Sequence, residues 1–404
     1  MNLGNLAYEK LEALSQFTDS GEGITRLFLT KEHREASNYL REIMEKAGLE
    51  VEMDNIGNLI GTYRTSKNTD KTLVLGSHQD TVKNGGKYDG ALGIILPIVA
   101  LEKCIKDGIE LDYNVKIVSF GDEEGVRFAT TYLGSKALAG TFTEDLLERI
   151  SEEGTSLRDE LINFGLNPEA IGECRLKENV TAYLEIHIEQ GPVLEHEDLA
   201  IGIVNAIQGS HRYQIDIEGI AGHAGTVPMK YRSDAGIGSA EVMVEFTNYI
   251  EKLDGIVATF GIVELSPGSI NVIPGKSRFT LDIRSLDNNL IASSVEKFKE
   301  IVSKVAERRK LRFKVENTNI APSCECSSRI INMLEKSVED IGYKPFNFPS
   351  GAGHDAQEMK NLTDMGMLFV RCKDGISHNP LESVKSEDLE IASEVLVEFL
   401  KNYN

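Results

Sequence analysis

A chain of 404 residues, 41% of them apolar, is longer than one hydrophobic core usually supports, so we expect two folded domains and exclude fibrous and disordered classes. Its 64 acidic and 43 basic residues give a net charge of −21, which repels phosphate groups and excludes nucleic acid and membrane surfaces as partners. The longest apolar run, 91–101, is too short to span a bilayer. The opening residues lack the pattern of a secretory signal, so a cytoplasmic location is expected.

Apolar residues at helical spacing predict helices over 3–17 and 31–47. Strands and helices then alternate, as a hairpin over 51–63, a strand at 72–76, a helix at 90–106 and a strand at 115–120. This alternation predicts an α/β domain in which helices cover a mostly parallel sheet. Further on, the segment 183–189 alternates strictly and predicts a strand whose polar face carries Glu185, His187 and Glu189.

From residue 211 the pattern changes to strand, helix, strand, strand, helix, strand. The predicted segments are 211–219, 234–252, 256–265, 276–284, 290–309 and 311–317. Their order is similar to a ferredoxin-like α+β arrangement, with an antiparallel sheet and two helices on one face. We therefore predict a satellite domain at 210–324, inserted between two parts of a catalytic domain, 1–209 and 325–404.

The first candidate site residues follow the strand at 72–76. His78 lies at the end of this strand, and Asp80 can accept the other ring N–H of His78, as carboxylates behind metal-binding histidines do. Asp89 lies in a glycine-flanked turn, where a carboxylate can bridge two cations. A lone His-x-Asp is more often an ordinary strand end, so this group needs support from other parts of the chain.

Three adjacent carboxylates, Asp122, Glu123 and Glu124, follow the buried strand at 115–120. They raise one another's pKa unless solvent or a cation neutralises them, so the segment is either a solvated loop or part of a metal site. In a metal site, one glutamate can bind the cation while its neighbour acts as a general base on a water.

Two further histidines, His187 on its strand face and His378 in a turn, each have an ordinary explanation when taken singly. Together with His78, Asp89 and one glutamate of the acidic segment, they supply five imidazole and carboxylate ligands. The five cysteines are scattered and are interpreted as reduced structural thiols. The ligand set suits two divalent ions of the zinc, manganese, cobalt or nickel kind that share Asp89.

With these motifs in place, the sequence resembles the hydantoinase/carbamoylase type of amidase, within the superfamily of dinuclear-metal aminoacylases and carboxypeptidases. The similarity covers nearly the whole chain. Eight matching segments occur in the family's order, at 76–82, 87–90, 122–125, 185–192, 222–229, 271–275, 350–356 and 375–380.

The resemblance implies a role for each residue of the metal site. One metal would be bound by His78, Asp89 and His187, and the other by Asp89, Glu124 and His378. Glu123 would be the general base. The peptide bond between Asp89 and Gly90 would be cis, a geometry that costs about 3 to 4 kcal/mol and persists only where a site over-determines it.

The resemblance also implies substrate contacts. Arg284 and Asn271 would bind a substrate carboxylate, and His223 would stabilise the developing oxyanion from the partner subunit. A homodimer through the satellite domain is therefore implied. The ureido group would be contacted by Gln190, Gly353 and His354.

The implied reaction is hydrolysis of the ureido (N-carbamoyl) C–N bond of a small carboxylic acid, with release of ammonia and carbon dioxide. The amino-acid sequences of 86–90, 122–128, 133–140 and 367–372 are most similar to those of allantoate amidohydrolases. One departure is Ser210, where allantoate-type members carry Gln. The alternatives are hydrolysis of N-carbamoyl-L-amino acids by the same machinery and a non-catalytic binding protein on the same fold.

Overall fold

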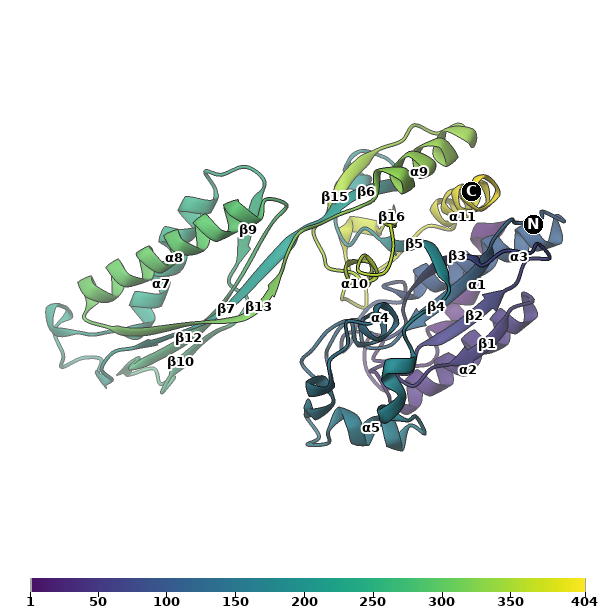
Figure 1. Cartoon of the computed structure of the whole chain (residues 1–404). Coiled ribbons are helices and arrows are strands. Elements are labelled where there is room, and N and C mark those ends of the chain that lie inside the picture. The colour runs from purple at the N-terminus through teal and green to yellow at the C-terminus, as the bar shows by residue number, and fades with distance from the viewer. Residues whose placement is uncertain (1, 404) are drawn as a thin grey trace. The chain divides into compact units, whose positions relative to one another are not determined.

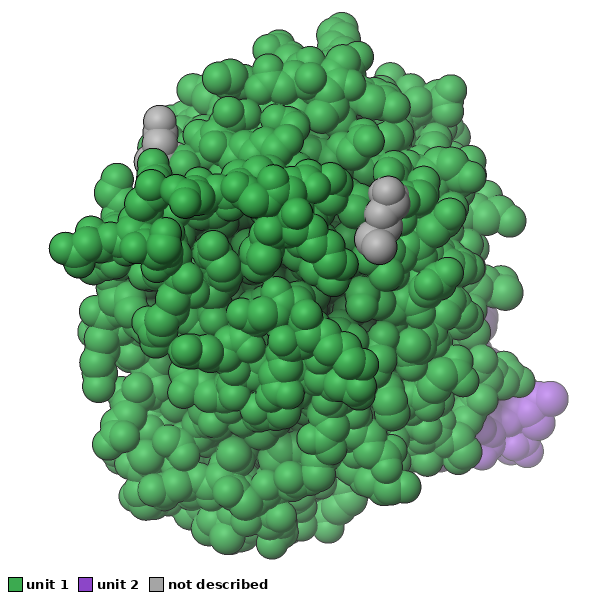
Figure 2. Space-filling model, turned by 90° about the vertical axis from the view of Figure 1, so that its right-hand side faces the viewer, with its two compact units in different colours: residues 1–205, 326–404 green, residues 206–325 purple. Residues whose placement is uncertain are grey.

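The computed structural model describes residues 2–403, and the chain divides into two compact units. The first unit contains 1–205 and 326–404, and the second contains 206–325. They are coloured green and purple in Figure 2. No helix among residues 2–403 is long and apolar enough to cross a membrane.

The first unit is built on a twisted sheet whose four central strands are parallel (Figure 1). These are β4 (Asn114–Phe120), β3 (Lys71–His78), β5 (Asn179–Ile188) and β16 (Met365–Val370). Antiparallel strands extend the sheet at both sides, namely β1 (Glu50–Met53), β2 (Leu59–Tyr63), β6 (Ile201–Ile207) and β14 (Cys324–Glu325). A further strand, β15 (Asn347–Ser350), pairs with β6. The predicted α/β class with a mostly parallel central sheet is confirmed.

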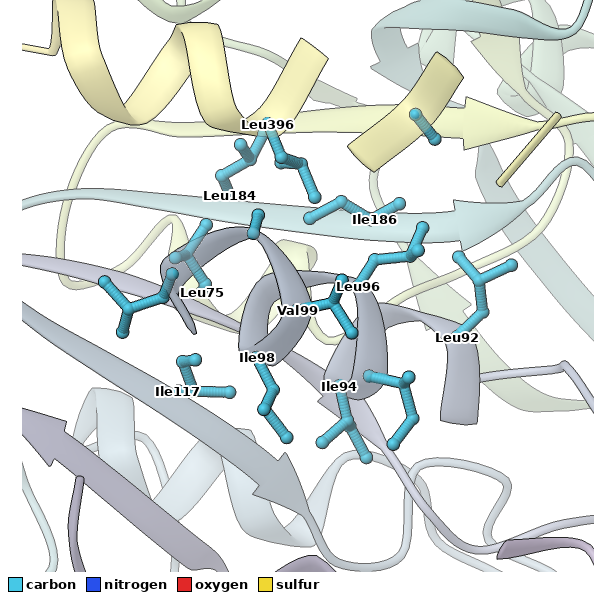
Figure 3. Packing of buried hydrophobic residues seen from close by; sticks show 14 of the residues in the cluster. Leu75, Leu92, Ile94, Leu96, Ile98, Val99, Ile117, Leu184, Ile186 and Leu396 are labelled. Atoms are coloured by element: carbon cyan, nitrogen blue, oxygen red, sulfur yellow. The ribbon is translucent and has the colours of Figure 1, made fainter. Parts of the chain in front are cut away.

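The main helices of this unit share one core on the sheet. They are α1 (Leu3–Leu14), α2 (Lys31–Lys46), α3 (Ala91–Lys106), α9 (Ser328–Asp340) and α11 (Ser386–Asn402). Helix α3 is apolar around its whole circumference because it lies between the sheet and α11. Figure 3 shows Leu96 and Val99 of α3 packed near Leu184 and Ile186 of β5. Burying side chains of this size stabilises the fold by about 1.5 to 3 kcal/mol each.

Shorter helices lie in the segments that connect the strands of this sheet. They are α4 (Leu133–Ala139), α5 (Leu157–Asn163), α6 (Val193–His196) and α10 (Ala356–Met359). A second cluster of buried residues, including Phe28, Phe128 and Leu161, packs under this region. Because the central strands are parallel, the segments that follow β3, β4, β5 and β16 emerge at one edge of the sheet, where open α/β folds place their ligand sites.

The second unit is an antiparallel sheet with two helices and its own core. The sheet contains β7 (Gly209–Glu218), β9 (Ile256–Thr259), β10 (Val263–Ser266), β12 (Lys276–Ser285) and β13 (Arg312–Ala321). The helices α7 (Ala235–Ile250) and α8 (Asn288–Arg309) pack on it through Phe246 and Phe298, against Phe279 of β12. A separate short ribbon pairs β8 (Gly222–His223) with β11 (Val272–Ile273).

We predict that Gly93→Ala destabilises the first unit. A β carbon at Gly93 of α3 would clash with the carbonyl oxygen of Ile186 and lie 2.6 Å from the Ser77 β carbon. Overpacking of this kind costs about 1 to 3 kcal/mol. Gly172→Ala is the matched control, because nothing lies near its added β carbon. Urea unfolding followed by circular dichroism measures both, and equal midpoints for the two variants would contradict the close packing of α3 on β5.

Candidate metal and catalytic site

Three elements of the first unit bring His78, Asp89 and His187 together. His78 is the last residue of β3, His187 is next to the end of β5, and Asp89 ends the loop that leads into α3. All three are buried. The Nε2 atom of His187 lies 3.1 Å from Asp89 Oδ1, and that of His78 lies 3.8 Å from the same oxygen. Their possible ligand atoms all lie within 4.8 Å of one another, which is close enough to hold one cation.

A second group shares Asp89 with the first. His378 Nε2 lies 3.0 Å from Asp89 Oδ2 and 3.3 Å from Glu124 Oε1. These three residues also have possible ligand atoms within 4.8 Å of one another. Asp89 Oδ1 therefore faces His78 and His187, and Asp89 Oδ2 faces His378.

The donor chemistry of these groups fits a divalent cation. Both groups combine imidazole nitrogens with carboxylate oxygens, which bind ions of the zinc and manganese kind. Glu124 Oε1 is buried and accepts no hydrogen bond within the described residues, although His378 stands beside it. A buried acceptor without a hydrogen bond is costly, so an oxygen in this position is suited to a cation.

Without a cation, protons compensate the charge of the site. Burial would raise the pKa of Asp89, but hydrogen bonds from His187 and His378 hold it well below its usual range. Burial lowers the pKa of His187, and its hydrogen bond with Asp89 outweighs that effect and raises the pKa to about 9. The neighbouring carboxylates of Asp89 and Glu124 raise the pKa of His378 to about 11.

Glu123 stands beside both groups in the loop after β4. Its Oε2 lies 3.9 Å from His78 Nε2, and the residue is only 8% exposed. Burial, followed by the charges of Glu124 and Asp355, raises the pKa of Glu123 well above its usual range. A carboxylate with this high proton affinity, close to the cation groups, is suited to accept and return a proton.

The prediction that the Asp80 carboxylate accepts the ring N–H of His78 is wrong. His78 Nδ1 instead lies 2.9 Å from the backbone carbonyl oxygen of Asp80, and the carboxylate is 3.7 Å away. The two oxygens of this carboxylate accept the backbone N–H groups of Glu123 and Glu124, each at 3.1 Å. The residue therefore supports the site, but it does so by fixing the acidic loop while its own backbone orients His78.

The predicted cis peptide between Asp89 and Gly90 is also wrong. The cis bond among the described residues is Ser266–Pro267. At Gly90 the chain turns through a positive φ of 65°, which favours glycine. A β carbon there would clash with the His78 ring, so glycine also allows the close approach of the loop to β3.

Three non-glycine residues with left-handed backbone angles lie in the site loops. Asp122, Gln190 and His378 have φ values of 57°, 55° and 54°. Such conformations cost about 1 to 3 kcal/mol each and persist where the surrounding structure holds them, often at functional sites. They direct three different loops toward Asp89.

The residues predicted to contact a ureido group lie around the same centre. Gln190 Nε2 donates to both oxygens of Asp89, at 3.2 and 3.1 Å. His354 is buried with its ring edge against His187, at 4.5 Å between centroids, and its Nε2 is 2.9 Å from Ser350 Oγ. At Gly353, a β carbon would clash with the hydroxyl of Tyr132.

The second unit carries the other three predicted substrate residues. His223 and Asn271 lie together, because the Asn271 carbonyl accepts the N–H of Ala224 at 3.0 Å. Arg284 lies opposite Ser210 near one end of the β7–β12 pair. Its guanidinium donates to both oxygens of Asp282, at 3.0 and 2.8 Å.

Within one chain, Arg284 lies far from His223 and Asn271. The β7–β12 pair runs from Arg284 at one end to Lys276 and Glu218 at the other, and the short β8–β11 ribbon joins the sheet beyond that second end. Arg284 lies eight residues after Lys276 along an extended strand, a span of about 26 Å.

Sequence reasoning did not find several buried polar residues that hold the site loops. Arg26 is 1% exposed, and its Nε donates to the backbone carbonyl of Gln79 at 2.7 Å, beside His78. Glu382 is buried next to Asp89 and accepts its backbone N–H at 3.0 Å. Neither residue stands out in hydropathy periodicity or motif spacing, and only burial reveals them.

Comparison with known proteins identifies the family of this chain. The model of peptidase family M20/M25/M40 matches residues 74–402. A probable allantoate deiminase of Oryza sativa subsp. japonica is 38% identical over 97% of this chain and 87% of its own. An N-carbamoyl-L-amino acid amidohydrolase of Geobacillus stearothermophilus is 37% identical over 93% and 92%. The crystal structure of a hydantoinase/carbamoylase family amidase from Burkholderia multivorans aligns with a TM-score of 0.89 at 30% identity, over 98% and 97%. The chain therefore belongs to the M20/M25/M40 peptidase family of hydrolases, and its predicted resemblance to the hydantoinase/carbamoylase amidases within it is confirmed.

Proposed function

We propose that this chain is a ureido-acid amidohydrolase that binds two divalent cations, zinc or manganese in kind, with cobalt or nickel as other suitable ions. The observation that carries the proposal is the sharing of Asp89 by two ligand groups, with Glu123 buried beside them. His78, Asp89 and His187 would hold one cation, and Asp89, Glu124 and His378 the other. When bound, such cations polarise a carbonyl group and make a water more acidic.

The remaining steps belong to the chain's own side chains. Glu123 accepts a proton from the attacking water and returns it to the nitrogen that leaves, for which its raised pKa suits it. Attack on the ureido carbonyl breaks its bond to the substituted nitrogen, which leaves as an amine. The carbamate that results decays to ammonia and carbon dioxide. Arg284, released from Asp282, presents a two-pronged donor to the substrate carboxylate.

Allantoate is the substrate that we propose. Similarity to a probable allantoate deiminase over almost the whole chain supports it. The second candidate is an N-carbamoyl-L-amino acid, which the relative from Geobacillus stearothermophilus favours. The two differ beyond the shared carboxylate and ureido groups. Allantoate carries a second ureido group that needs hydrogen-bond partners, whereas an aliphatic amino acid needs an apolar pocket. Ser210, opposite Arg284, is a polar but short side chain at this position.

The predicted outcome is faster ammonia release from allantoate than from N-carbamoyl-L-amino acids, assayed side by side. Removal of metal with EDTA abolishes the activity, and manganese or zinc restores it, because the side chains alone cannot polarise the carbonyl group and acidify the water as the cations do. Release from N-carbamoyl-L-amino acids alone would replace the proposed substrate by the second candidate. Turnover that survives EDTA, or none with any ureido acid, would contradict the amidohydrolase itself.

Replacement of Glu123 tests the general base. We expect Glu123→Gln to retain its metal, measured by elemental analysis, and to lose about 10²- to 10⁴-fold in kcat, because the amide cannot accept the proton. The exposed Glu144→Gln serves as control and keeps the wild-type rate. A kcat for Glu123→Gln close to that of the wild type would remove this residue as the base.

A homodimer with shared sites is the proposed assembly. The proposal is supported by the distance between Arg284 and the pair His223 and Asn271 within one satellite domain. All three residues are proposed to contact one small substrate, which residues this far apart in a single chain cannot do. A partner subunit that contributes His223 and Asn271 would resolve this separation.

Mixed dimers test the sharing. His223→Ala and Glu123→Gln are each expected to be inactive, but co-expressed chains regain about a quarter of the wild-type activity. Half of randomly assorted dimers are mixed, and each mixed dimer has one complete site of two. If His223 acted within its own subunit, every site would lack one residue and the mixture would stay inactive. Light scattering checks that all three samples are dimers.

A further inference from the structure

Glu382 lies outside the ligand groups and shows the surroundings of a functional carboxylate. It follows His378 in the same turn and is only 4% exposed. A buried carboxylate is costly unless hydrogen bonds compensate its lost hydration. The identity of its partners therefore indicates what the residue does.

The first oxygen of Glu382 holds the loop that carries the shared aspartate. Oε1 accepts the backbone N–H groups of Tyr88, at 2.8 Å, and Asp89, at 3.0 Å. Two consecutive N–H groups directed at one oxygen fix the direction of the chain at that point. The backbone of Asp89 is thereby fixed from a segment almost three hundred residues away in the sequence.

The second oxygen acts through a hydroxyl. Ser377 Oγ lies 2.9 Å from Glu382 Oε2 and 3.2 Å from Asp89 Oδ2. A hydroxyl has one proton to donate, and the shorter contact is with Glu382. Glu382 therefore competes with Asp89 for this proton and draws one hydrogen-bond donor away from Asp89 Oδ2. The same bond fixes the residue that precedes His378.

The loop is adapted to this contact. A β carbon at Gly86 would clash with the carboxyl group of Glu382, so the approach of the loop requires glycine at this position. Glu382 is also absent from the ligand groups that the described residues form around Asp89. Its oxygens are directed to backbone N–H groups and to Ser377, which is the pattern of a residue that positions others.

We propose that Glu382 is a positioning residue that holds Asp89 and the Ser377–His378 turn in one arrangement, so that the shared carboxylate meets both cations. The inference rests on the two-cation site of the proposed function. Replacement of Glu382 is therefore expected to weaken cation binding, an effect that a role in packing alone would not produce.

The test is a titration of metal-free protein with manganese, in which calorimetry measures the binding. Glu382→Ala is expected to weaken manganese binding by about 10- to 100-fold, as loss of a residue that orients metal ligands does. Glu382→Gln keeps an acceptor for the two N–H groups but has no second acceptor for Ser377, so its loss is smaller. At saturating manganese, kcat falls more than KM rises in both variants, because the substrate contacts are intact.

Asp234→Ala is the matched control. Asp234 also accepts two backbone N–H groups, from Gly236 at 3.0 Å and Ile237 at 3.1 Å. It caps the start of α7 in the second unit, which contains none of the proposed metal ligands. We expect this variant to have a lower thermal midpoint and an unchanged manganese affinity. The comparison separates loss of stability from loss of metal binding.

Wild-type manganese affinity in both Glu382→Ala and Glu382→Gln would overturn the inference while the proposed function stands. If Glu382→Ala does not fold, Glu382→Gln together with Ser377→Ala decides the question, since each removes the hydroxyl link and leaves an acceptor for the N–H groups of Tyr88 and Asp89. The proposed function fails separately, when metal-loaded wild-type protein releases no ammonia from any ureido acid.

Discussion

The carboxylate of Asp89 is the interaction on which the site depends. It is 4% exposed, and its two oxygens face His187 on one side and His378 on the other. A buried charge of this kind requires compensation, from protonated imidazoles or from cations. Because both ligand groups include this one residue, loss of its carboxylate would remove a ligand from both groups at once. The loop before α3, the end of β5 and the turn near the carboxyl terminus all converge on this side chain.

Carboxylates surround the centre and set its chemistry. Burial raises the pKa values of Asp122, Glu123 and Asp355 well above their usual range, and repulsion from neighbouring carboxylates, Asp80 among them, adds to the effect. The raised pKa values of His187 and His378 keep protons in the metal-free site, so cations must displace them on binding. A carboxylate with high proton affinity beside the two ligand groups is what the proposed hydrolytic base requires. The proposed base thus belongs to a cluster of carboxylates whose proton affinity burial raises.

Sequence periodicity predicts much of this arrangement for a simple physical reason. The apolar strands β3 and β4 and the alternating strand β5 are recognisable singly, and parallel strands bring their carboxyl ends to one edge. His78, the acidic loop and His187 are therefore expected near one another. What periodicity does not predict depends on tertiary contacts: Asp80 binds the backbone of the acidic loop instead of the His78 ring, and Glu382 reaches Asp89 across the fold. The antiparallel pair β1–β2 at one side of the sheet is predicted by local pattern, as the hairpin over 51–63, whereas β6 and β14 at the other side follow from packing partners.

The most direct test of the shared aspartate counts bound cations. Metal-free protein is loaded with manganese or zinc, freed of excess ion and analysed for metal per chain. The account predicts two ions in the wild type, close to one in His187→Ala and in His378→Ala, and almost none in Asp89→Asn, whose amide cannot bridge two cations. An Asp89→Asn variant that keeps one tightly bound ion, or a wild type that never exceeds one, would contradict the shared centre.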